Sequence, residues 1–336
     1  MSATLAENRA VRRVPVPPAG ELPPAEPERP ESAWSESVAA RLVAALIDNA
    51  PAGPLAETRL RAAIADTVSR PGKLVRARLA CATTRAHGID GETGLMLATA
   101  VEFFHLSSLL LDDLPCMDDA ATRRGHACVH RTYGEATAIL AALAFINRAY
   151  ALVGFALATQ PGIVRMQAQA CLDACLGTAG LVGGQARDLR FAFSDRSARE
   201  VARIAIGKTG AMLWLGLLFP ALLAAPNAAE RRALEALCVY WSLAFQALDD
   251  LHDVLATSVD AGKTTGRDRA LVRPNLAVAL GVPATRGRIA RQLGQAQRQI
   301  ATLAALRPAW SYLHEFQTYF AQLSQAAMGG TAEVAA

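Results

Sequence analysis

Aspartates gather at two places in this chain where the surrounding sequence is strongly apolar. The first group follows three leucines and comprises Asp112, Asp113, Asp118 and Asp119, and the second comprises Asp249, Asp250 and Asp253. Carboxylates inside apolar helices are costly to bury unless a cation neutralises them. Two such groups suggest one shared site, in which several Mg²⁺ ions hold a diphosphate between two helices.

The second group has the spacing of a helical pair. Asp249 and Asp253 are four residues apart, so on a helix they share one face and can grip the same cation. Asp250 points partly aside and can orient its neighbours. A solvated acidic face is the alternative, but residues 241–248 are almost wholly apolar, which favours burial at the start of this stretch.

The first group needs a break in its helix. Asp112 and Asp118 are six residues apart, which on an ideal helix leaves them about 120° from alignment. Pro115 lies between them and disrupts the regular helix, so Asp118 can swing back toward Asp112. Because Mg²⁺ prefers a few carboxylates, waters and phosphate oxygens to an all-protein cage, we expect Asp112, Asp113 and Asp118 to bind it, with Asp119 as a polar neighbour.

Cationic residues recur beside helix breaks and near the carboxylates. Lys73 and Arg76 are three residues apart, on one helix face, just after a Pro-Gly break. Each cation alone would most often lie on the surface, but a diphosphate needs direct cationic partners, and the recurrence favours that role. The candidates are Lys73, Arg76, Arg123, Arg124, Lys208 with the adjacent Thr209, and Lys263.

Strand-like alternation is scarce in a sequence that is 52% hydrophobic. With many Gly and Pro breaks from Ser35 onward, this predicts an all-α fold, a single large bundle of antiparallel helices around a central active-site cavity. Residues 1–34 are rich in Pro and Glu and are expected to form a disordered leader, with a transit peptide as the alternative. We expect one domain over residues 35–328 and a frayed tail over residues 329–336.

Charge, cysteines and apolar runs exclude several classes of protein. The net charge of +4 comes with scattered Arg and no basic block, so nucleic acid is not an expected partner. The six cysteines lack the paired spacing of zinc sites and fit a reduced, cytoplasmic setting. The stretch from Gly210 to Pro226 comes nearest to a membrane span, but Pro220 breaks it, so we expect a buried core helix and no span.

An ordered set of motifs runs along the chain. The motifs are Gly72-Lys73-x-x-Arg76, His105, the Asp112–Asp118 group, Arg123-Arg124-Gly125, Gly184-Gln185-x-x-Asp188-Leu189, Lys208-Thr209, Phe245-Gln246 and Asp249-Asp250-x-x-Asp253. Over about residues 35–325 this set resembles the trans-isoprenyl diphosphate synthases, the polyprenyl synthetase family. Residues 105–125 and 133–141 are most similar to bacterial geranylgeranyl diphosphate synthases of the carotenoid type.

The resemblance implies the isoprenoid synthase fold, a homodimer, and condensation of isopentenyl diphosphate with an allylic diphosphate. About three Mg²⁺ ions per active site would be bound by Asp112, Asp113, Asp118, Asp249, Asp250 and Asp253. With Lys208, these aspartates would form the catalytic set. The allylic diphosphate would be contacted by Arg123, Lys208, Thr209, Gln246 and Lys263, and isopentenyl diphosphate would be held by Lys73, Arg76, His105 and Arg124.

Two departures from the family pattern stand out. Where relatives usually carry Gly-Lys-Asp and then Lys-Ser/Thr-Thr, this chain has Gly266-Arg267-Asp268 and Arg273-Pro274-Asn275. Arg keeps the charge of Lys but not its compact ammonium, which leaves the role of Arg273 as a phosphate ligand open. Many relatives carry His before the first Asp pair, where this chain has Leu111, a residue that the carotenoid-type enzymes tolerate there.

Product length should depend on the residues just before the first aspartate group. Ser107 and Ser108 leave room where a bulky aromatic residue would stop the chain at fifteen carbons, and Phe103 with Phe104 could form the next floor. We therefore expect geranylgeranyl diphosphate, made from farnesyl diphosphate, and expect Ser107→Phe to shorten it. The alternative is that the serines merely pack against a neighbouring helix.

Other activities fit the sequence less well. A farnesyl diphosphate synthase is the alternative within the family. A non-catalytic subunit that modulates another prenyl synthase tends to lose one aspartate group, and this chain keeps both. A class I terpene cyclase needs no second diphosphate site, which Lys73, Arg76 and His105 would form.

Overall fold

The structure is a computed structural model that describes residues 31–255 and 273–329. The chain divides into two units, Met1–Glu31 and Ser32–Ala336, and the helices belong to the second. The predicted domain boundary at residue 34 falls slightly late, because Ala33 is buried and Ser32 Oγ donates a hydrogen bond to Glu315. Ser32 and Ala33, which lie within the predicted leader, therefore contact the helical unit.

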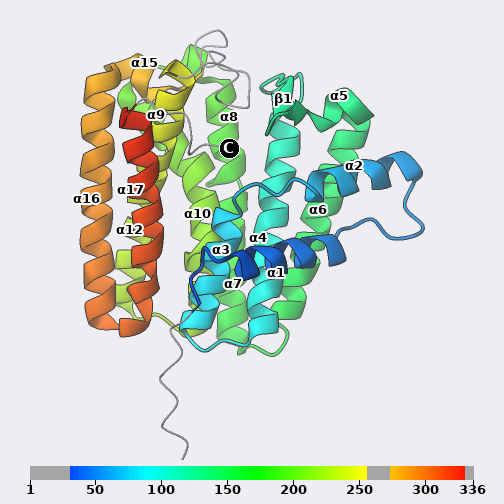
Figure 1. Ribbon diagram of the computed structural model, residues 1–336, viewed down its shortest axis with the longest axis horizontal. Helices are drawn as coiled ribbons and strands as arrows, with labels where there is room; N and C mark the ends of the chain where they lie inside the picture. Colours follow the sequence, from blue (N-terminus) through cyan, green and yellow to red (C-terminus); the bar gives the residue numbers. More distant parts are fainter. Residues whose placement is uncertain (1–30, 256–272, 330–336) are drawn as a thin grey trace, which may run out of the picture. The chain divides into compact units, whose positions relative to one another are not determined.

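The described residues form an all-α fold, as predicted (Figure 1). The long helices are α1 (Glu36–Asp48), α2 (Thr58–Val68), α3 (Val75–Ala86), α4 (Gly91–Asp112), α6 (Glu135–Ala156), α7 (Gly162–Leu176), α12 (Ala228–Leu255), α16 (Val282–Leu306) and α17 (Leu313–Gly329). The shorter elements are α5 (Val129–Tyr133), α8 (Leu181–Leu189), η1 (Phe191–Phe193), α9 (Ala198–Ala205), η2 (Ile206–Gly210), α10 (Ala211–Gly216), α11 (Leu218–Ala221), η3 (Leu222–Ala224), α15 (Leu276–Leu280) and η4 (Pro308–Tyr312).

One small hairpin interrupts the helices. Strands β1 (Thr122–Arg123) and β2 (His126–Ala127) pair antiparallel, with Thr122 opposite Ala127. Gly125 turns the hairpin at a φ of +76°, which a residue with a side chain adopts only under strain. The hairpin places Arg123 beside the end of α4.

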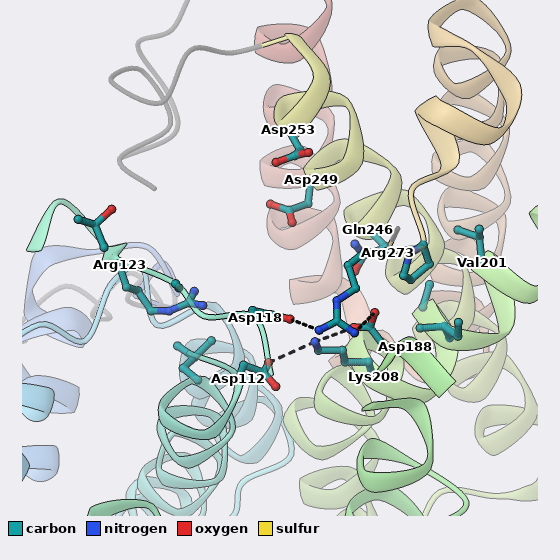
Figure 2. Close-up of a pocket in the computed structure, with 16 residues that line it drawn as sticks. Asp112, Asp118, Arg123, Asp188, Val201, Lys208, Gln246, Asp249, Asp253 and Arg273 are labelled. Carbon is teal, nitrogen blue, oxygen red and sulfur yellow. Dashed lines mark hydrogen bonds and ion pairs between the residues drawn. The ribbon is translucent and has the colours of Figure 1, made fainter. Parts of the chain in front are cut away.

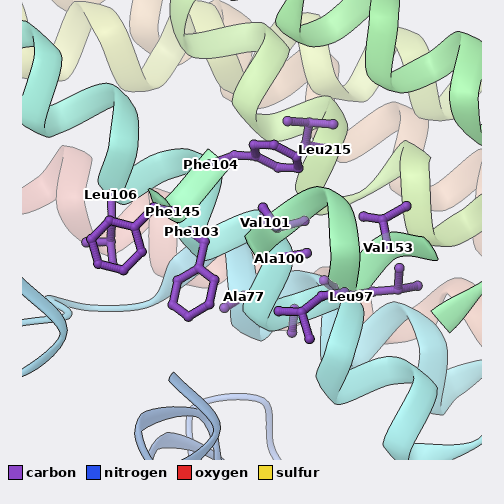
Figure 3. Close-up of a cluster of buried hydrophobic side chains, with 14 of the residues drawn as sticks. Ala77, Leu97, Ala100, Val101, Phe103, Phe104, Leu106, Phe145, Val153 and Leu215 are labelled. Atoms are coloured by element: carbon purple, nitrogen blue, oxygen red, sulfur yellow. The ribbon is translucent and has the colours of Figure 1, made fainter. Parts of the chain in front are cut away.

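Two apolar clusters hold the helices together. In the first, α4 packs against α3 and α6, and the Phe103 and Phe145 rings lie 5.2 Å apart between their centres (Figure 3). In the second, α12 packs against α16 and α17, where Trp241 and Trp310 are fully buried. Helix α4 therefore lies inside apolar packing until Asp112, so the aspartates that follow lie at the edge of the core.

More helices have the length and composition of a membrane span than the sequence analysis expected. Among the residues that the structure describes, three qualify on these grounds alone, namely Gly91–Asp112, Glu135–Ala156 and the continuous helical run Ala198–Ala224. The expectation that Gly210–Pro226 comes nearest to a span was wrong, because Glu135–Ala156 is more apolar than the run Ala198–Ala224, which contains most of that stretch. In the most apolar 18-residue stretch of each helix, 67% is buried inside the protein for the first and third, whereas 39% is buried for Glu135–Ala156.

Candidate active site

Two neighbouring cavities occupy the ends of α4, α8 and α12. The first has a volume of about 240 Å³ and is lined mainly by charged side chains, namely Asp112, Asp118, Arg123, Asp188, Lys208, Asp249, Asp253 and Arg273 (Figure 2). The second has a volume of about 320 Å³. Asp112, Lys208 and Gln246 line both cavities, so the two adjoin at these side chains.

The first aspartate group is shaped by the end of α4. The helix ends at Asp112, and the following turn closes with a 2.9 Å hydrogen bond from the Asp118 amide to the Asp112 carbonyl. The structure thereby places Asp118 back beside Asp112, the arrangement expected from Pro115. Burial raises the pKa of Asp112 to about 6, although the nearby Lys208 ammonium opposes the rise.

Asp113, predicted as a metal ligand, is turned away from both of these cavities. Its buried carboxylate accepts hydrogen bonds from Arg123, at 2.8 Å from Nε and 2.6 Å from Nη2. Burial alone would lower the pKa of Arg123, but the bond to Asp113 outweighs it and raises that pKa. In this structure Asp113 therefore orients Arg123, which itself lines both cavities.

The second aspartate group divides in the same way. Asp249 and Asp253 lie one turn apart on α12 and both line the first cavity (Figure 2). Asp250, also predicted as a metal ligand, is 1% exposed and accepts hydrogen bonds from Gln246 Nε2 at 2.9 Å and from the Leu276 amide at 2.6 Å. Asp250 thus ties α12 to the start of α15.

Lys208 is presented by an irregular turn. Residues Ile206–Gly210 form a π-helical turn between α9 and α10. Gly184 on α8 lies against it so closely that an added Cβ would sit 2.6 Å from the Lys208 backbone nitrogen. The Lys208 ammonium then lies 3.3 Å from Asp112 and 3.0 Å from Asp188. Burial opposes its charge, but these two carboxylates prevail and raise the pKa of Lys208.

Asp188 is a cavity residue that the sequence analysis did not select. It is 8% exposed, its Oδ2 accepts from Lys208, and its buried Oδ1 has no hydrogen-bond partner within the described structure. Its place in the Gly184-Gln185-x-x-Asp188 motif was the signal that could have identified it.

Arg273 reaches into the first cavity from the segment before α15. Its Nη2 donates to the Met117 carbonyl at 2.6 Å and to Asp118 Oδ1 at 3.1 Å, and its Nη1 lies 3.9 Å from Asp188. The side chain is 10% exposed. Arg273 therefore contacts the first aspartate group directly, in spite of its departure from the family's Lys.

The second cavity collects the other predicted cations. It is lined by Lys73, Arg76, His105, Arg124, Thr209 and Gln246, together with Glu102, Met212 and Tyr319. Arg76 Nη1 lies 3.5 Å from His105 Nε2, and Thr209 Oγ1 donates to Gln246 Oε1 at 2.8 Å. Burial lowers the pKa of His105 well below its usual value, and Arg76 and Arg124 lower it further, so the ring is neutral.

Glu102 is the carboxylate of this second cavity, and the sequence analysis did not select it. It is 1% exposed and lies one helical turn before His105 on α4. Burial raises the pKa of Glu102 to about 7, against the opposing charges of Arg76 and Arg124. A carboxylate three residues from His105 on the same helix face was the available signal.

The four residues predicted to set chain length divide by helix face. Ser108 lines the second cavity, whereas Ser107 is 3% exposed and its hydroxyl donates to the Phe104 carbonyl. The structure therefore places Ser108, and not Ser107, at this cavity, since neighbouring helical residues point about 100° apart. Phe104 lies one turn below Ser108, with its ring 5.1 Å from Tyr150, and Phe103 packs on Phe145 in the core.

The remaining predictions concern the metal and Lys263. Lys263 lies outside the described residues. Within residues 31–255 and 273–329, no three His, Cys, Asp or Glu side chains gather closely enough to hold a metal ion on their own. Asp112 and Asp118 instead line one side of the cavity and Asp249 and Asp253 another, so a bound cation would need further oxygen ligands.

Fold, cavity and motifs agree with the comparison to known families. The polyprenyl synthetase family model matches residues 57–307, and the chain belongs to this family. Its members elongate prenyl diphosphates, so the chain is a prenyltransferase. The match excludes the first and last helices of the described structure, α1 and α17.

Curated relatives include enzymes with two different products. The chain is 35% identical to a geranylgeranyl diphosphate synthase of Pseudescherichia vulneris, over 76% of this chain and 83% of the relative. It is 31% identical to a farnesyl diphosphate synthase of Geobacillus stearothermophilus, over 76% of this chain and 87% of the relative. The nearly equal identities leave the product to be argued from the cavity.

Solved structures share the fold. An FPP/GFPP synthase from Zymomonas mobilis superposes with a TM-score of 0.72 at 28% identity, covering 84% of this chain and 96% of that one. A geranyltransferase from Helicobacter pylori, complexed with magnesium and isoprenyl diphosphate, gives 0.77 at 23% identity, covering 88% and 99%. At that identity the second likeness shows the fold alone.

Proposed function

We propose that this chain condenses isopentenyl diphosphate with farnesyl diphosphate to give geranylgeranyl diphosphate and pyrophosphate. The observation that carries the proposal is the pair of adjoining cavities. One holds opposed carboxylates with the partly buried cations Lys208 and Arg273, and the other holds Lys73, Arg76 and Arg124 around a neutral His105. Two diphosphates of unequal roles need two such cationic sites, whereas a terpene cyclase needs only one.

The carboxylates of the first cavity suit Mg²⁺. Asp112, Asp118, Asp249 and Asp253 offer only hard oxygen donors, and Mg²⁺ usually completes its shell with water and substrate phosphate oxygens. Bound there, Mg²⁺ would neutralise charge on the leaving diphosphate. Its presence in the Helicobacter pylori relative's structure supports this choice. We propose about three ions per site, the number that the resemblance to the polyprenyl synthetases implies.

The protein's own groups would do the remaining work. Lys208 and Arg123 lie at the junction of the cavities, where they can bind the allylic diphosphate as its C–O bond breaks. Breaking this bond leaves an allylic carbocation. The double bond of isopentenyl diphosphate, which Lys73, Arg76 and Arg124 would hold, then attacks this carbocation. A new C–C bond forms, and the released pyrophosphate takes the proton that is lost.

The cavity near Ser108 supports a twenty-carbon product. Ser108 and Met212 line the second cavity, and no Phe, Tyr or Trp of α4 is among its lining residues. The Phe104 ring one turn deeper would form the floor. A farnesyl diphosphate synthase is the alternative, favoured by the Geobacillus stearothermophilus relative and by that same ring.

The apolar face of α6 supports a homodimer. The exposed apolar side chains on this helix are Ile139, Leu140, Leu143, Tyr150 and Phe155. Three helices of the described chain are long and apolar enough to cross a membrane. Of these, α6 has the smallest buried share in its most apolar 18-residue stretch. A second copy of the chain packed on this face would cover surface that is otherwise costly to expose.

The function is tested with purified protein, Mg²⁺, isopentenyl diphosphate and each allylic starter. We expect condensation, preference for farnesyl diphosphate, and a twenty-carbon product measured by mass spectrometry. Asp249→Asn should abolish turnover and serves as the control for contaminating synthases. No condensation with dimethylallyl, geranyl or farnesyl diphosphate would overturn the proposal and favour a non-catalytic subunit.

A further inference from the structure

Two segments outside the family match meet beside the second cavity. The family model covers residues 57–307, whereas Trp34 precedes α1 and Tyr319 lies on α17. Their rings stack with centres 4.2 Å apart and planes 23° from parallel, and Trp34 also contacts Phe316 at 5.4 Å. Aromatic pairs in this geometry are stabilising beyond the surface they bury. The beginning and the end of the helical unit are thus joined at this point.

Hydrogen bonds fix the residues just before Trp34 to α17. One carboxylate oxygen of Glu315 accepts from Ser32 Oγ at 2.8 Å and from the Ala33 amide at 3.0 Å. Glu315 lies one helical turn before Tyr319 on the same helix. The Trp34 ring is therefore held over Tyr319 by its own backbone as well as by stacking.

Arg78 connects the same segment to the turn that carries Lys73. This buried α3 side chain donates to the Ala33 carbonyl at 2.6 Å and to the Lys73 carbonyl at 3.2 Å. Its guanidinium also lies 5.4 Å from the centre of the Trp34 ring. The turn at Lys73 needs such support, because Leu74 adopts a φ of +55°, which is strained for a residue with a side chain.

Tyr319 is the member of this group that reaches the cavity. It lines the second cavity together with Lys73, Arg76 and His105. Burial raises the pKa of Tyr319 to about 12, although Arg76 and Arg78 oppose the rise. The phenol is therefore protonated at neutral pH and can donate a hydrogen bond.

We propose that Tyr319 is a further contact for isopentenyl diphosphate, and that Trp34 and Arg78 are positioning residues that hold Tyr319 and Lys73 at the second cavity. This inference rests on the proposed function. It places part of the binding site on segments that the family model does not cover. The phenol hydroxyl would donate to a phosphate oxygen, a charge-assisted bond whose loss should weaken binding about tenfold.

The test compares four variants of the full chain by steady-state kinetics with Mg²⁺ and farnesyl diphosphate. Tyr319→Phe keeps the stacked ring and removes only the hydroxyl, so we expect a KM for isopentenyl diphosphate about tenfold higher. Trp34→Ala should raise the same KM about fivefold. Trp34→Phe keeps a ring at this position, so its KM should stay close to the wild-type value. The KM for farnesyl diphosphate should stay unchanged in all three.

Tyr312→Phe is the matched control. The Tyr312 hydroxyl bonds to Thr83 at 2.7 Å and does not line the second cavity, so its loss should lower stability without changing either KM. Should Trp34→Ala fail to fold, Tyr319→Phe still tests the hydroxyl contact, and Trp34→Phe still tests the positioning role of the Trp34 ring.

The outcomes separate the inference from the proposed function. An active wild-type enzyme whose KM for isopentenyl diphosphate is the same in Tyr319→Phe would overturn the Tyr319 contact. Equal rises in both KM values would also overturn it, because a general structural role would move them together. A wild-type protein that condenses no starter would instead remove the proposed function.

Discussion

At the scale of single residues, Asp188 and Lys208 form the pair on which the first cavity depends. Asp188→Asn keeps the side chain's size but removes its charge, so the Lys208 ammonium loses its 3.0 Å anchor. We expect the kcat/KM for the allylic diphosphate to fall about tenfold to a hundredfold, the range for losing a charge-assisted hydrogen bond. The KM for isopentenyl diphosphate should change little.

Glu200→Gln is the control for Asp188→Asn, since Glu200 also pairs with cations but lines neither cavity, and its partners Arg187 and Arg203 are exposed. It should leave turnover unchanged. Tighter allylic binding in Asp188→Asn would show that Asp188 acts mainly as a counter-charge, and would contradict the prediction.

Glu102 should make stability depend on pH. Its pKa rises from 4.5 to about 7 on folding, so its contribution is present below about pH 4.5 and is lost as pH rises through about 7. The shift corresponds to about 3 kcal/mol. We therefore expect Glu102→Gln to gain stability relative to wild type between pH 5 and pH 8, as urea unfolding can measure. Parallel pH profiles for the two proteins would contradict this.

Ser108 should set product length and Ser107 should not. Only Ser108 lines the cavity, so Ser108→Phe should shorten the product to fifteen carbons in the starter assay. Ser107→Phe would instead overpack the α4–α6 core and lower stability by about 1–3 kcal/mol. A shortened product from Ser107→Phe alone would restore the original expectation.

At the scale of elements, the crossing of α8 and the π-helical turn positions Lys208. A Cβ on Gly184 would meet backbone atoms of Gly207 and Lys208, which cannot move aside as a flexible side chain can. Gly184→Ala should therefore separate Lys208 from Asp188, lower stability by about 1–3 kcal/mol and reduce condensation.

Gly294→Ala on α16 is the matched control for Gly184→Ala. No atom lies within 4 Å of its added Cβ, so the substitution should raise stability by about 0.5–1 kcal/mol through helix propensity. Chemical denaturation of both variants checks the pair. Equal stability changes in the two variants would show that the close contact of α8 with the π-helical turn does not cause the loss of stability in Gly184→Ala.

At the scale of the whole molecule, the apolar face of α6 should hold two copies of the chain together. Leu143 is 55% exposed on this face, and Leu143→Glu should convert dimers to monomers in light-scattering measurements at micromolar concentration. Leu55→Glu, at a residue 99% exposed elsewhere, should leave the dimer intact. A wild-type protein that is monomeric at all concentrations would refute the dimer.

Sequence alone was sufficient for the fold class and the reaction class. The helical period of the apolar residues and the order of charged motifs are properties of the sequence itself, so they can be read without a structure. Together with the resemblance to the polyprenyl synthetases that these motifs carry, they predicted an all-α prenyltransferase and many of the charged residues that line the two cavities. They also indicated that Asp118 must return toward Asp112, because Pro115 interrupts the helix between them.

Only the tertiary structure decided which members of each group face the cavity. Asp113 and Asp250 were indistinguishable from their neighbours in sequence, yet partners from the β1–β2 hairpin and from α15 turn them away. Sequence also did not distinguish Ser107 from Ser108, of which only Ser108 lines a cavity. It gave no sign that Trp34 and Tyr319, far apart along the chain, stack on each other. A side chain's direction depends on the helix beside it, and that neighbour is set by long-range packing rather than by local pattern.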